Sequence, residues 1–535
     1  MDEFTRRDAV KLAAAIATWQ AAPGGIAHGA DRWDAGPVNH ILPAVGADRV
    51  AVNVSLERAV GPVRLLVDGR PASAERLDRE GRFWRFAATG LQPDRTYRLE
   101  LQARGSALCD PWPLATFPDP GSEPARFRLA SFTCAGGHED AAANLPVEVF
   151  RSLDFRRRML RRIADFRPDA VIANGDHIYW DQRSWLESRD PAVRGMAQRL
   201  YSGFPSLDPD APIWSQDNET ALLAIGESQI SALYGVTFRS TPVWFLGDDH
   251  DYFENDEAND RFVTFPPTDF HYAAKARLAE TFYPGMPAPA PLAAPAGPGS
   301  RGRDAAGSPT GRAFASMRFG RLFEALLYDC AGYLSHSGRE PGLVPSDAEA
   351  WIQDRTRRSD ANHLLHVPSH PFGWTAGKWR EWYPDTDQTG GPLDAARNAN
   401  QSKYLWPGEW NEQHQRLLRA MTRRERPAMS LSGDLHAVGR GVITQSGALD
   451  LSRTPLHSIL AGPISTSEAG WPSFARGAAA RIAESISMDG GELAEQNGFV
   501  VMDFEADRVT IRRFACSDLD EAAGELKRPV ETIVL

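Results

Sequence analysis

Metal-binding side chains follow five short apolar runs of this sequence. The runs, with the polar groups that end them, are residues 127–136, 169–181, 242–251, 363–372 and 428–436. They end in Asp, His, Cys and Tyr, whose side chains can bind a metal ion or move a proton. Such runs are typical of buried β-strands, and open α/β sheets bind ligands at the carboxyl ends of their strands. The series therefore predicts one metal site assembled from distant parts of the chain.

The elements that position these groups are expected after residue 125. Residues 127–132 and 170–173 are predicted to be strands, with a helix over residues 149–166 between them, because apolar residues recur there at helical spacing. This strand–helix–strand unit predicts an α/β domain over residues 126–535. One helix face is rich in arginine and is expected to be solvated rather than to bind an anion. Its arginines are Arg151, Arg156, Arg157, Arg158, Arg161 and Arg162.

A different pattern precedes that unit. Residues 36–118 carry short β runs separated by turn residues, which predicts a small β-sandwich of the immunoglobulin or fibronectin type. The dipeptide Asp68-Gly69 is expected to form a hairpin turn between two of the runs. Residues 119–125 are predicted to be the linker between the sandwich and the α/β domain.

The α/β domain is interrupted by two predicted insertions. They lie near residues 181–235, which are polar, and near residues 284–311, which are rich in Pro, Ala and Gly. Residues 321–334 are apolar enough to predict a buried strand. Near the end of the chain, Ala506-Asp507 is the expected turn of a hairpin.

Composition limits the class of protein. A chain of 535 residues with 42% hydrophobic and 24% charged residues is typical of a soluble globular protein with at least two domains. A net charge of -11 argues against nucleic-acid binding through excess positive charge. The four cysteines are too widely spaced for a disulfide framework or a Cys-x-x-Cys metal clip.

Residues 1–30 are expected to be a twin-arginine export signal. Arg6 and Arg7 precede a weakly apolar stretch over residues 12–19, and small residues from Ala27 onward offer a cleavage site. An ordinary amphipathic first helix is the alternative. The stretch is too short to span a bilayer, so no transmembrane segment is expected. The signal predicts a periplasmic or extracellular protein, exported by the twin-arginine translocase.

Taken in order, the polar groups resemble the signature of the calcineurin-like, or purple acid phosphatase-like, metallophosphatases. That family shows DxG, GDxxY, GNH[DE], VxxH and GHxH, each after a strand. The corresponding segments here are residues 134–136, 175–179, 248–251, 367–370 and 433–436. Any one motif is weak, and the resemblance rests on five in the same order. Taken singly, the polar residues could instead occupy turns, and Cys134 could be a small buried hydrophobe.

Three departures from that signature resemble the alkaline phosphatase D branch. Cys134 replaces the first Asp, Asp249 replaces the Asn, and Asp434 replaces the first His of the last motif. Members of that branch pair a small N-terminal β-domain with SGDxH and DDH[DE] motifs, and twin-arginine export is familiar among them. The resemblance implies a four-layer α/β sandwich, with two central sheets flanked by helices, that hydrolyses phosphate monoesters, diesters or both.

The same residues predict two neighbouring metal ions. Asp176, in the central motif, is the natural bridging carboxylate. The other expected ligands are Cys134, Tyr179 and His436 for the first ion and Asp249, His370 and Asp434 for the second. Thiolate and phenolate donors suit iron(III), while carboxylates suit a hard divalent ion such as calcium, manganese or magnesium. Such a pair supplies a hydroxide nucleophile and offsets the charge that develops on the phosphate.

The resemblance implies a catalytic role for His250. Its imidazole is expected to protonate the leaving oxygen or to stabilise the transition state, and not to bind metal. Asp248 and Asp251 are expected to support the ligands or to bind an additional cation. The runner-up function is a phospholipase D-like phosphodiesterase acting from the same site. An alternative of another class is a non-catalytic cell-surface binding protein.

Overall fold

The structure is a computed structural model that describes most of the chain after residue 32. The described residues are 33–137, 150–180, 191, 194–195, 198, 206–252, 269–284, 314–333, 342–376, 409–424, 426–475, 479–483, 485–516, 526 and 528–535. The expected export signal and all but the first residue of the 284–311 insertion lie outside these ranges. Among the described helices, none has the length and apolar character needed to cross a membrane.

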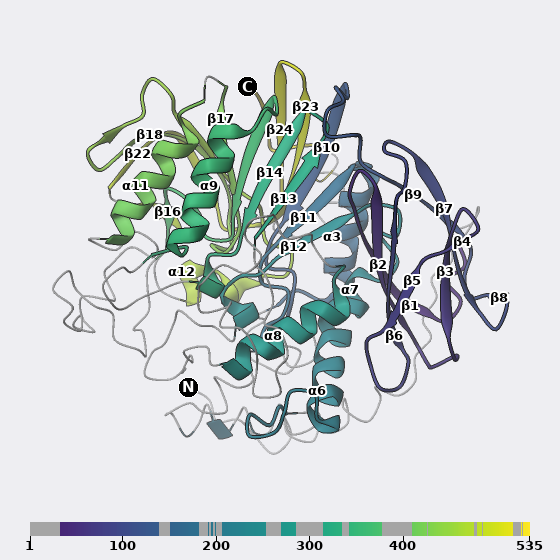
Figure 1. Ribbon diagram of the computed structural model, residues 1–535. Helices are drawn as coiled ribbons and strands as arrows, with labels where there is room; N and C mark the ends of the chain where they lie inside the picture. The colour runs from purple at the N-terminus through teal and green to yellow at the C-terminus, as the bar shows by residue number, and fades with distance from the viewer. Residues whose placement is uncertain are drawn as a thin grey trace.

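Two antiparallel sheets open the described chain and are drawn in purple in Figure 1. The first sheet, in spatial order, contains β1 (Val38–Val45), β2 (Arg49–Leu56), β6 (Phe83–Thr89) and β5 (Ser73–Arg76). The second contains β4 (Arg70–Pro71), β3 (Val63–Val67), β7 (Thr96–Ala103) and β8 (Ser106–Ala107), with β9 (Trp112–Ala115) also paired to β7. Buried side chains of both sheets join in one hydrophobic cluster. The domain limits at residues 36 and 118 stay a prediction.

The hairpin turn expected between β3 and β4 is present. Asp68 and Gly69 have φ of 47° and 77°, which are the left-handed values that a tight two-residue turn requires. Val67 pairs with Arg70 directly across this turn.

A six-stranded sheet carries the first three polar groups. Its strands, in spatial order, are β12 (Val243–Leu246), β11 (Ala170–Asn174), β10 (Arg126–Phe132), β23 (Asn497–Glu505), β24 (Arg508–Cys516) and β25 (Glu531–Val534). Strands β10, β11 and β12 are parallel, so their carboxyl ends lie at the same edge. Strands β23 and β24 form the expected hairpin, since Glu505 pairs with Arg508 across Ala506 and Asp507.

An eight-stranded sheet carries the last two polar groups. Its strands, in spatial order, are β13 (Phe314–Phe319), β14 (Phe323–Tyr328), β15 (His363–Pro368), β17 (Ala428–Ser432), β20 (Leu456–Leu460), β18 (Val438–Ser446) and β19 (Leu449–Asp450), with β22 (Ile486–Ala494) also paired to β18. A separate small pair joins β16 (Trp374–Thr375) to β21 (Arg481–Ile482). Strands β14, β15, β17 and β20 are parallel. All six residues of β14 are buried, so the buried strand predicted over residues 321–334 is present but shorter, and Ala331–Tyr333 forms a 3-10 turn instead.

Helices and short helical turns connect the strands. They are α3 (Leu153–Asp165), α6 (Gln216–Gly226), η1 (Glu227–Ser231), α7 (Ala232–Tyr234), η2 (Asp249–Tyr252), α8 (Asp269–Phe282), η4 (Ala331–Tyr333), α9 (Ser346–Arg358), α11 (Glu409–Met421), η5 (Glu468–Gly470) and α12 (Pro472–Ala475). In Figure 1, α9 and α11 lie beside the eight-stranded sheet and α3 lies beside the six-stranded sheet.

The two large sheets share a core because their side chains alternate between faces. Leu129 of β10 and Leu327 of β14 belong to the same central cluster. Their neighbours in sequence point the other way: Ala130 packs in the cluster that contains α3, and Leu326 packs in the cluster that contains α9 and α11. The central cluster also includes residues of the two N-terminal sheets, so the hydrophobic core is continuous.

The helix expected over residues 149–166 is present as α3, but it begins later, at Leu153, because the Ser152 side chain caps it by accepting a hydrogen bond from the Phe155 N–H. Its arginine face is not uniformly solvated, since Arg156 is only 1% exposed. The later part of the predicted insertion near residues 181–235 also forms α6, η1 and α7, whose buried apolar residues pack in the cluster beside the six-stranded sheet.

Candidate metal centre

The carboxyl ends of the two large sheets meet at the end of β11. The Asn174 amide donates to the carbonyl oxygens of Pro368 (3.3 Å) and Leu431 (3.4 Å), which lie at the ends of β15 and β17. Nearby, Thr133 after β10 forms a parallel bridge with Pro463 after β20. These contacts bring the loops that follow five parallel strands to one place. Asn174 was not predicted from sequence, although its position directly before Gly175-Asp176 was a usable signal.

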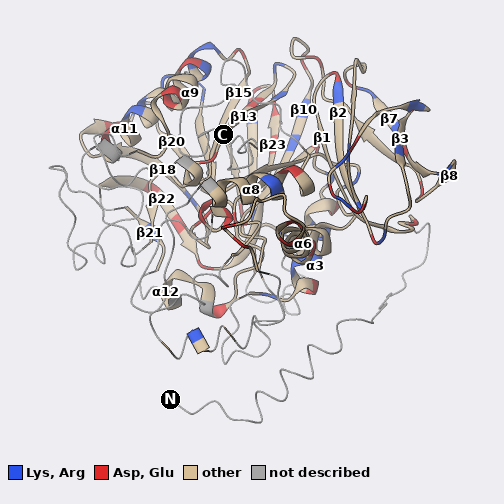
Figure 2. Ribbon diagram, turned by 60° about the horizontal axis from the view of Figure 1, so that its bottom comes forward, with Lys and Arg blue, Asp and Glu red and all other residues tan. Residues whose placement is uncertain are grey.

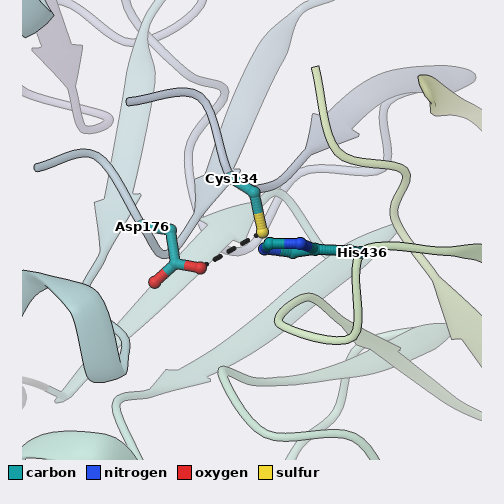
Figure 3. A group of neighbouring side chains, drawn as sticks. All are labelled: Cys134, Asp176 and His436. Atoms are coloured by element: carbon teal, nitrogen blue, oxygen red, sulfur yellow. Dashed lines mark hydrogen bonds between the residues drawn. The ribbon is translucent and has the colours of Figure 1, made fainter. Parts of the chain in front are cut away.

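The first group of donors comes from three of these loops. Cys134, Asp176 and His436 each offer one ligand atom, and these atoms all lie within 4.8 Å of one another (Figure 3). The Cys134 thiol donates to Asp176 Oδ2 at 3.2 Å. The Tyr179 hydroxyl lies 3.3 Å from Asp176 Oδ2 and 3.3 Å from His436 Nε2. The structure therefore brings together all the residues predicted around the first ion.

A second group joins the loop after β12 of the six-stranded sheet to loops of the eight-stranded sheet. One carboxylate oxygen each of Asp248, Asp249 and Asp434 lies within 4.8 Å of the others. His370 Nε2 lies 3.3 Å from Asp248 Oδ1, and both side chains are fully buried. Asp249, His370 and Asp434 were predicted together, and the structure adds Asp248 as the carboxylate between His370 and the other two.

A third group connects the first two. Donor atoms of Asp176, Asp249 and His250 also lie within 4.8 Å of one another. Asp176 is shared with the first group and Asp249 with the second, so the donors form one continuous array. The His250 ring packs against the Tyr179 ring, with 4.2 Å between centroids. His250 is therefore beside both groups of donors.

The loops that carry the donors have unusual backbone geometry. Eight described residues other than glycine have positive φ, and four of them are in this array: Cys134 (47°), Asp176 (56°), Asp434 (70°) and His436 (48°). Each such residue costs about 1–3 kcal/mol and persists only where the surroundings enforce it. Backbone strain of this kind clusters at functional sites.

One hydrogen bond determines how His436 faces the first group. Its Nδ1 lies 2.7 Å from the carbonyl oxygen of Gly470. Because a carbonyl oxygen can only accept, Nδ1 carries the proton, and Nε2 of the neutral ring turns its lone pair toward Tyr179. This is the tautomer that a metal-binding histidine needs, held by the kind of carbonyl that commonly orients such ligands.

Burial and neighbouring negative charges make the ionised forms of these donors unfavourable unless a cation is bound. Burial, followed by the charge of Asp249, raises the pKa of the Asp176 carboxyl well above its ordinary value. Burial, followed by the charge of Asp176, likewise raises the pKa of the Cys134 thiol. Asp176 Oδ1 is buried and accepts no hydrogen bond from the described residues. Positive ions would favour the ionised forms, so the donor set fits bound metal.

Two of the nine side chains in the array, those of His250 and His436, are partly exposed, and the others are buried. Figure 2 shows acidic positions gathered near α8 in the middle of the molecule.

Asp251 holds two of the loops together. Its carboxylate accepts hydrogen bonds from the backbone N–H groups of Asp176, His177, Ile178 and Asp248, at 2.9–3.0 Å. The side chain is 3% exposed. Asp251 thus supports the loops that carry Asp176 and Asp248, one of the two roles predicted for it.

Arg156 of α3 holds the first loop and was missed as a support from sequence. Its guanidinium donates to the carbonyl oxygens of Ala135 (3.2 Å) and Gly137 (3.3 Å), which follow Cys134. A run of arginines conceals the one that is buried, because its neighbours on the helix look the same in sequence.

The fold and the donor array define an α/β protein with a candidate metal centre at the carboxyl ends of its parallel strands. No family model and no curated protein matches this sequence. Among solved structures, that of PhoD, or alkaline phosphatase D, aligns with 95% of this chain and 90% of its own, with a TM-score of 0.52 and 13% identity. The predicted resemblance to the alkaline phosphatase D branch is thus confirmed at the level of the fold.

Two further solved structures are much less similar. Two structures of a β-glucuronidase from Parabacteroides merdae align with 72% and 93% of this chain and with 44% and 64% of their own, at 11% and 9% identity. Both have a TM-score of 0.20, which is too low to support any inference about fold or function.

Proposed function

We propose that this chain is a metal-dependent phosphoesterase that hydrolyses phosphate monoesters, diesters or both. The observation that carries the proposal is the continuous array of donors, in which Asp176 and Asp249 link three groups at the carboxyl ends of the strands. The fold shared with PhoD supports it. A binding protein without catalysis would have no need of so many buried ionisable side chains in one place.

Two metal ions fit the donors of this array. Cys134, Tyr179 and His436 would hold one ion and Asp248, Asp249, His370 and Asp434 the other, with Asp176 between them. When bound, such ions supply a nucleophile by lowering the pKa of water and offset the charge developing on phosphate. The thiolate and phenolate favour iron(III) at the first position, and the carboxylates favour calcium, manganese or magnesium at the second.

Three residues of this chain would donate a proton to the substrate or position the groups of the centre. His250, partly exposed and beside both groups, donates a proton to the leaving oxygen. The Tyr179 ring restricts the orientation of the His250 ring by packing against it. Asp251 keeps the loops of Asp176 and Asp248 at a fixed separation through its backbone hydrogen bonds.

The proposal also covers the arrangement of layers in the fold and the cellular location of the protein. We propose that the two large sheets with their outer helices are the four-layer sandwich of the metallophosphatases. The shared central cluster and the two outer clusters support this arrangement. Arg6 and Arg7 with the apolar stretch that follows support export to the periplasm or beyond by the twin-arginine route.

Activity on two generic esters tests the function. The purified protein is expected to hydrolyse nitrophenyl phosphate or bis-nitrophenyl phosphate, and to lose that activity on treatment with a chelator. Asp176→Asn should lower kcat at least 100-fold, because it removes the charge of the shared carboxylate, while Asp507→Asn in the exposed turn should not change it. Preference for the diester would favour the phosphodiesterase reading.

Two results would contradict the proposal. Absence of metal together with ligand binding but no hydrolysis of either ester would favour a non-catalytic binding protein. Elemental analysis that found only zinc in natively exported protein would refute the iron assignment, although not the hydrolysis.

A further inference from the structure

A π-helical turn lies beside the loops of the first donor group. The turn η1 (Glu227–Ser231) joins α6 to α7, and the Ala232 N–H donates to the Glu227 carbonyl, five residues earlier. π-turns are rare, occur mostly as single bulges within α-helices, and are frequent at functional sites. The side chains of this π-turn are therefore candidates for a role at the donor array.

The middle residue of the turn, Gln229, connects two of the metal-site loops. Its Oε1 accepts hydrogen bonds from the backbone N–H groups of Gly137 (2.8 Å) and Tyr179 (3.0 Å). Its Nε2 donates to the carbonyl oxygen of Tyr179 at 3.2 Å. One amide thus fixes both polar groups of the Tyr179 backbone and holds that residue against the loop that begins with Cys134.

The contact is tight as well as polar. Gln229 is 1% exposed. A Cβ added at Gly136 would lie 2.5 Å from the His177 carbonyl oxygen and 3.0 Å from Gln229 Oε1. Gly136 is therefore required for the two loops and the Gln229 amide to approach one another, which explains the glycine in the first motif.

The opposite face of the same turn is held by the first N-terminal sheet. Glu227 pairs with Arg82 directly before β6, and Ser231 Oγ lies 3.2 Å from His40 Nδ1 of β1 and 3.3 Å from Ser55 Oγ of β2. Glu227 and Ser231 are four residues apart and share a face, with Gln229 midway between them on the other. The turn therefore spans the space between the first antiparallel sheet and the candidate metal centre.

We propose that Gln229 is a positioning residue for the metal centre, and that the N-terminal sheet holds the turn that presents it. Its amide sets the separation of the Cys134 and Tyr179 loops, so that the Tyr179 hydroxyl meets Asp176 and His436 at 3.3 Å. The inference rests on the proposed function only in that the array binds metal. It gives the N-terminal sheets a part in the centre that the motifs do not show.

Metal affinity of the whole protein, measured by competition with a chelator, tests this role. Gln229→Met, of similar size but without the amide, is expected to weaken the affinity about 10- to 100-fold, as is typical of residues that orient metal ligands. With nitrophenyl phosphate, kcat should fall by a similar factor with little change in KM. The matched control is Asn218→Leu, a buried amide on α6 that instead bonds the backbone of Asp208 and Pro212.

The control variant should keep the metal affinity and kcat of the unaltered protein. If Gln229→Met does not fold, Gln229→Asn carries the same expectation, because its amide is one methylene too short to reach both loops. Unchanged affinity in a folded Gln229 variant, or equal losses in Asn218→Leu, would overturn the role. If the unaltered protein binds metal but hydrolyses no ester, the proposed function fails while the affinity comparison still tests Gln229.

Discussion

At the scale of single residues, the histidines differ in what their surroundings permit. His436 is fixed by the Gly470 carbonyl and presents Nε2 to Tyr179 and Asp176, as a ligand would. His250 packs on the Tyr179 ring and, like His436, keeps part of its surface exposed. The proton transfer proposed for His250 needs such access to a substrate.

We expect His250→Ala to retain the metal and to lower kcat about 100- to 10,000-fold, the usual contribution of general acid catalysis. Elemental analysis and kinetics on nitrophenyl phosphate measure the two effects separately. His457→Ala, near the amino end of β20 and thus away from the donors, is the control and should leave kcat unchanged. Loss of metal in the His250 variant would instead assign this histidine to the ligands.

At the scale of elements, the geometry of the candidate metal centre depends on the helices and turns that hydrogen-bond to its loops. Helix α3 supports the Cys134 loop through Arg156, the π-turn supports it through Gln229, and η2 contributes Asp251. These supports fix the backbone more than the ligand side chains. They explain how Cys134 and Asp176 hold positive φ, which their side chains disfavour.

Arg156→Met tests the support from α3. We expect it to lower the free energy of unfolding by about 2–3 kcal/mol, because charged hydrogen bonds to the Ala135 and Gly137 carbonyls are lost, and to weaken metal binding. Arg161→Met on the same helix replaces an exposed arginine and should change stability by about 0.5 kcal/mol or less. Chemical denaturation and elemental analysis compare the two variants. Equal effects would show that Arg156 has no special role.

At the scale of the whole molecule, polar contacts join the N-terminal sheets to the rest of the chain. Asn53 of β2 donates to the carbonyl oxygens of Glu280 (3.1 Å) and Thr281 (3.0 Å) at the end of α8. His40 of β1 lies 3.3 Å from the Phe282 carbonyl oxygen. Because these polar groups are buried and hydrogen-bonded, the first N-terminal sheet packs against α8 and η1 in one preferred orientation.

Buried histidines make the stability of the molecule sensitive to acid. Burial lowers the pKa of His414, on α11 against Phe372, from its ordinary value of 6.5 to about 3. The unfolded chain therefore gains a proton below about pH 6.5 that the folded chain does not accept until about pH 3. The free energy of unfolding thus falls as the pH drops through this range.

His414→Phe should remove the contribution of His414 to this pH dependence. Between pH 7 and pH 5 the unaltered protein is expected to lose about 2 kcal/mol more than the variant, and the difference should vanish between pH 8 and pH 7. Urea unfolding at the three pH values measures the effect. Parallel losses in the two proteins would mean that His414 is accessible to protons in the folded state.

The sequence by itself determined the kinds of elements and the identities of the donors. Alternation and apolar runs marked β10, β11 and β14, Asp68-Gly69 marked a hairpin, and five ordered motifs marked the Cys134, Asp176 and His436 loops. Each of these signals acts between residues that are close in the chain, so a local pattern is enough to reveal it.

Only the tertiary structure decided which side chains meet. Asp248 joins Asp249 and Asp434, Arg156 turns inward among arginines that are partly or fully exposed, and Gln229 reaches two loops from a π-turn. The physical reason is that these contacts depend on the register of parallel strands and on how two sheets pack together. Residues 134 and 436 become neighbours through that packing, which no pattern of adjacent residues encodes.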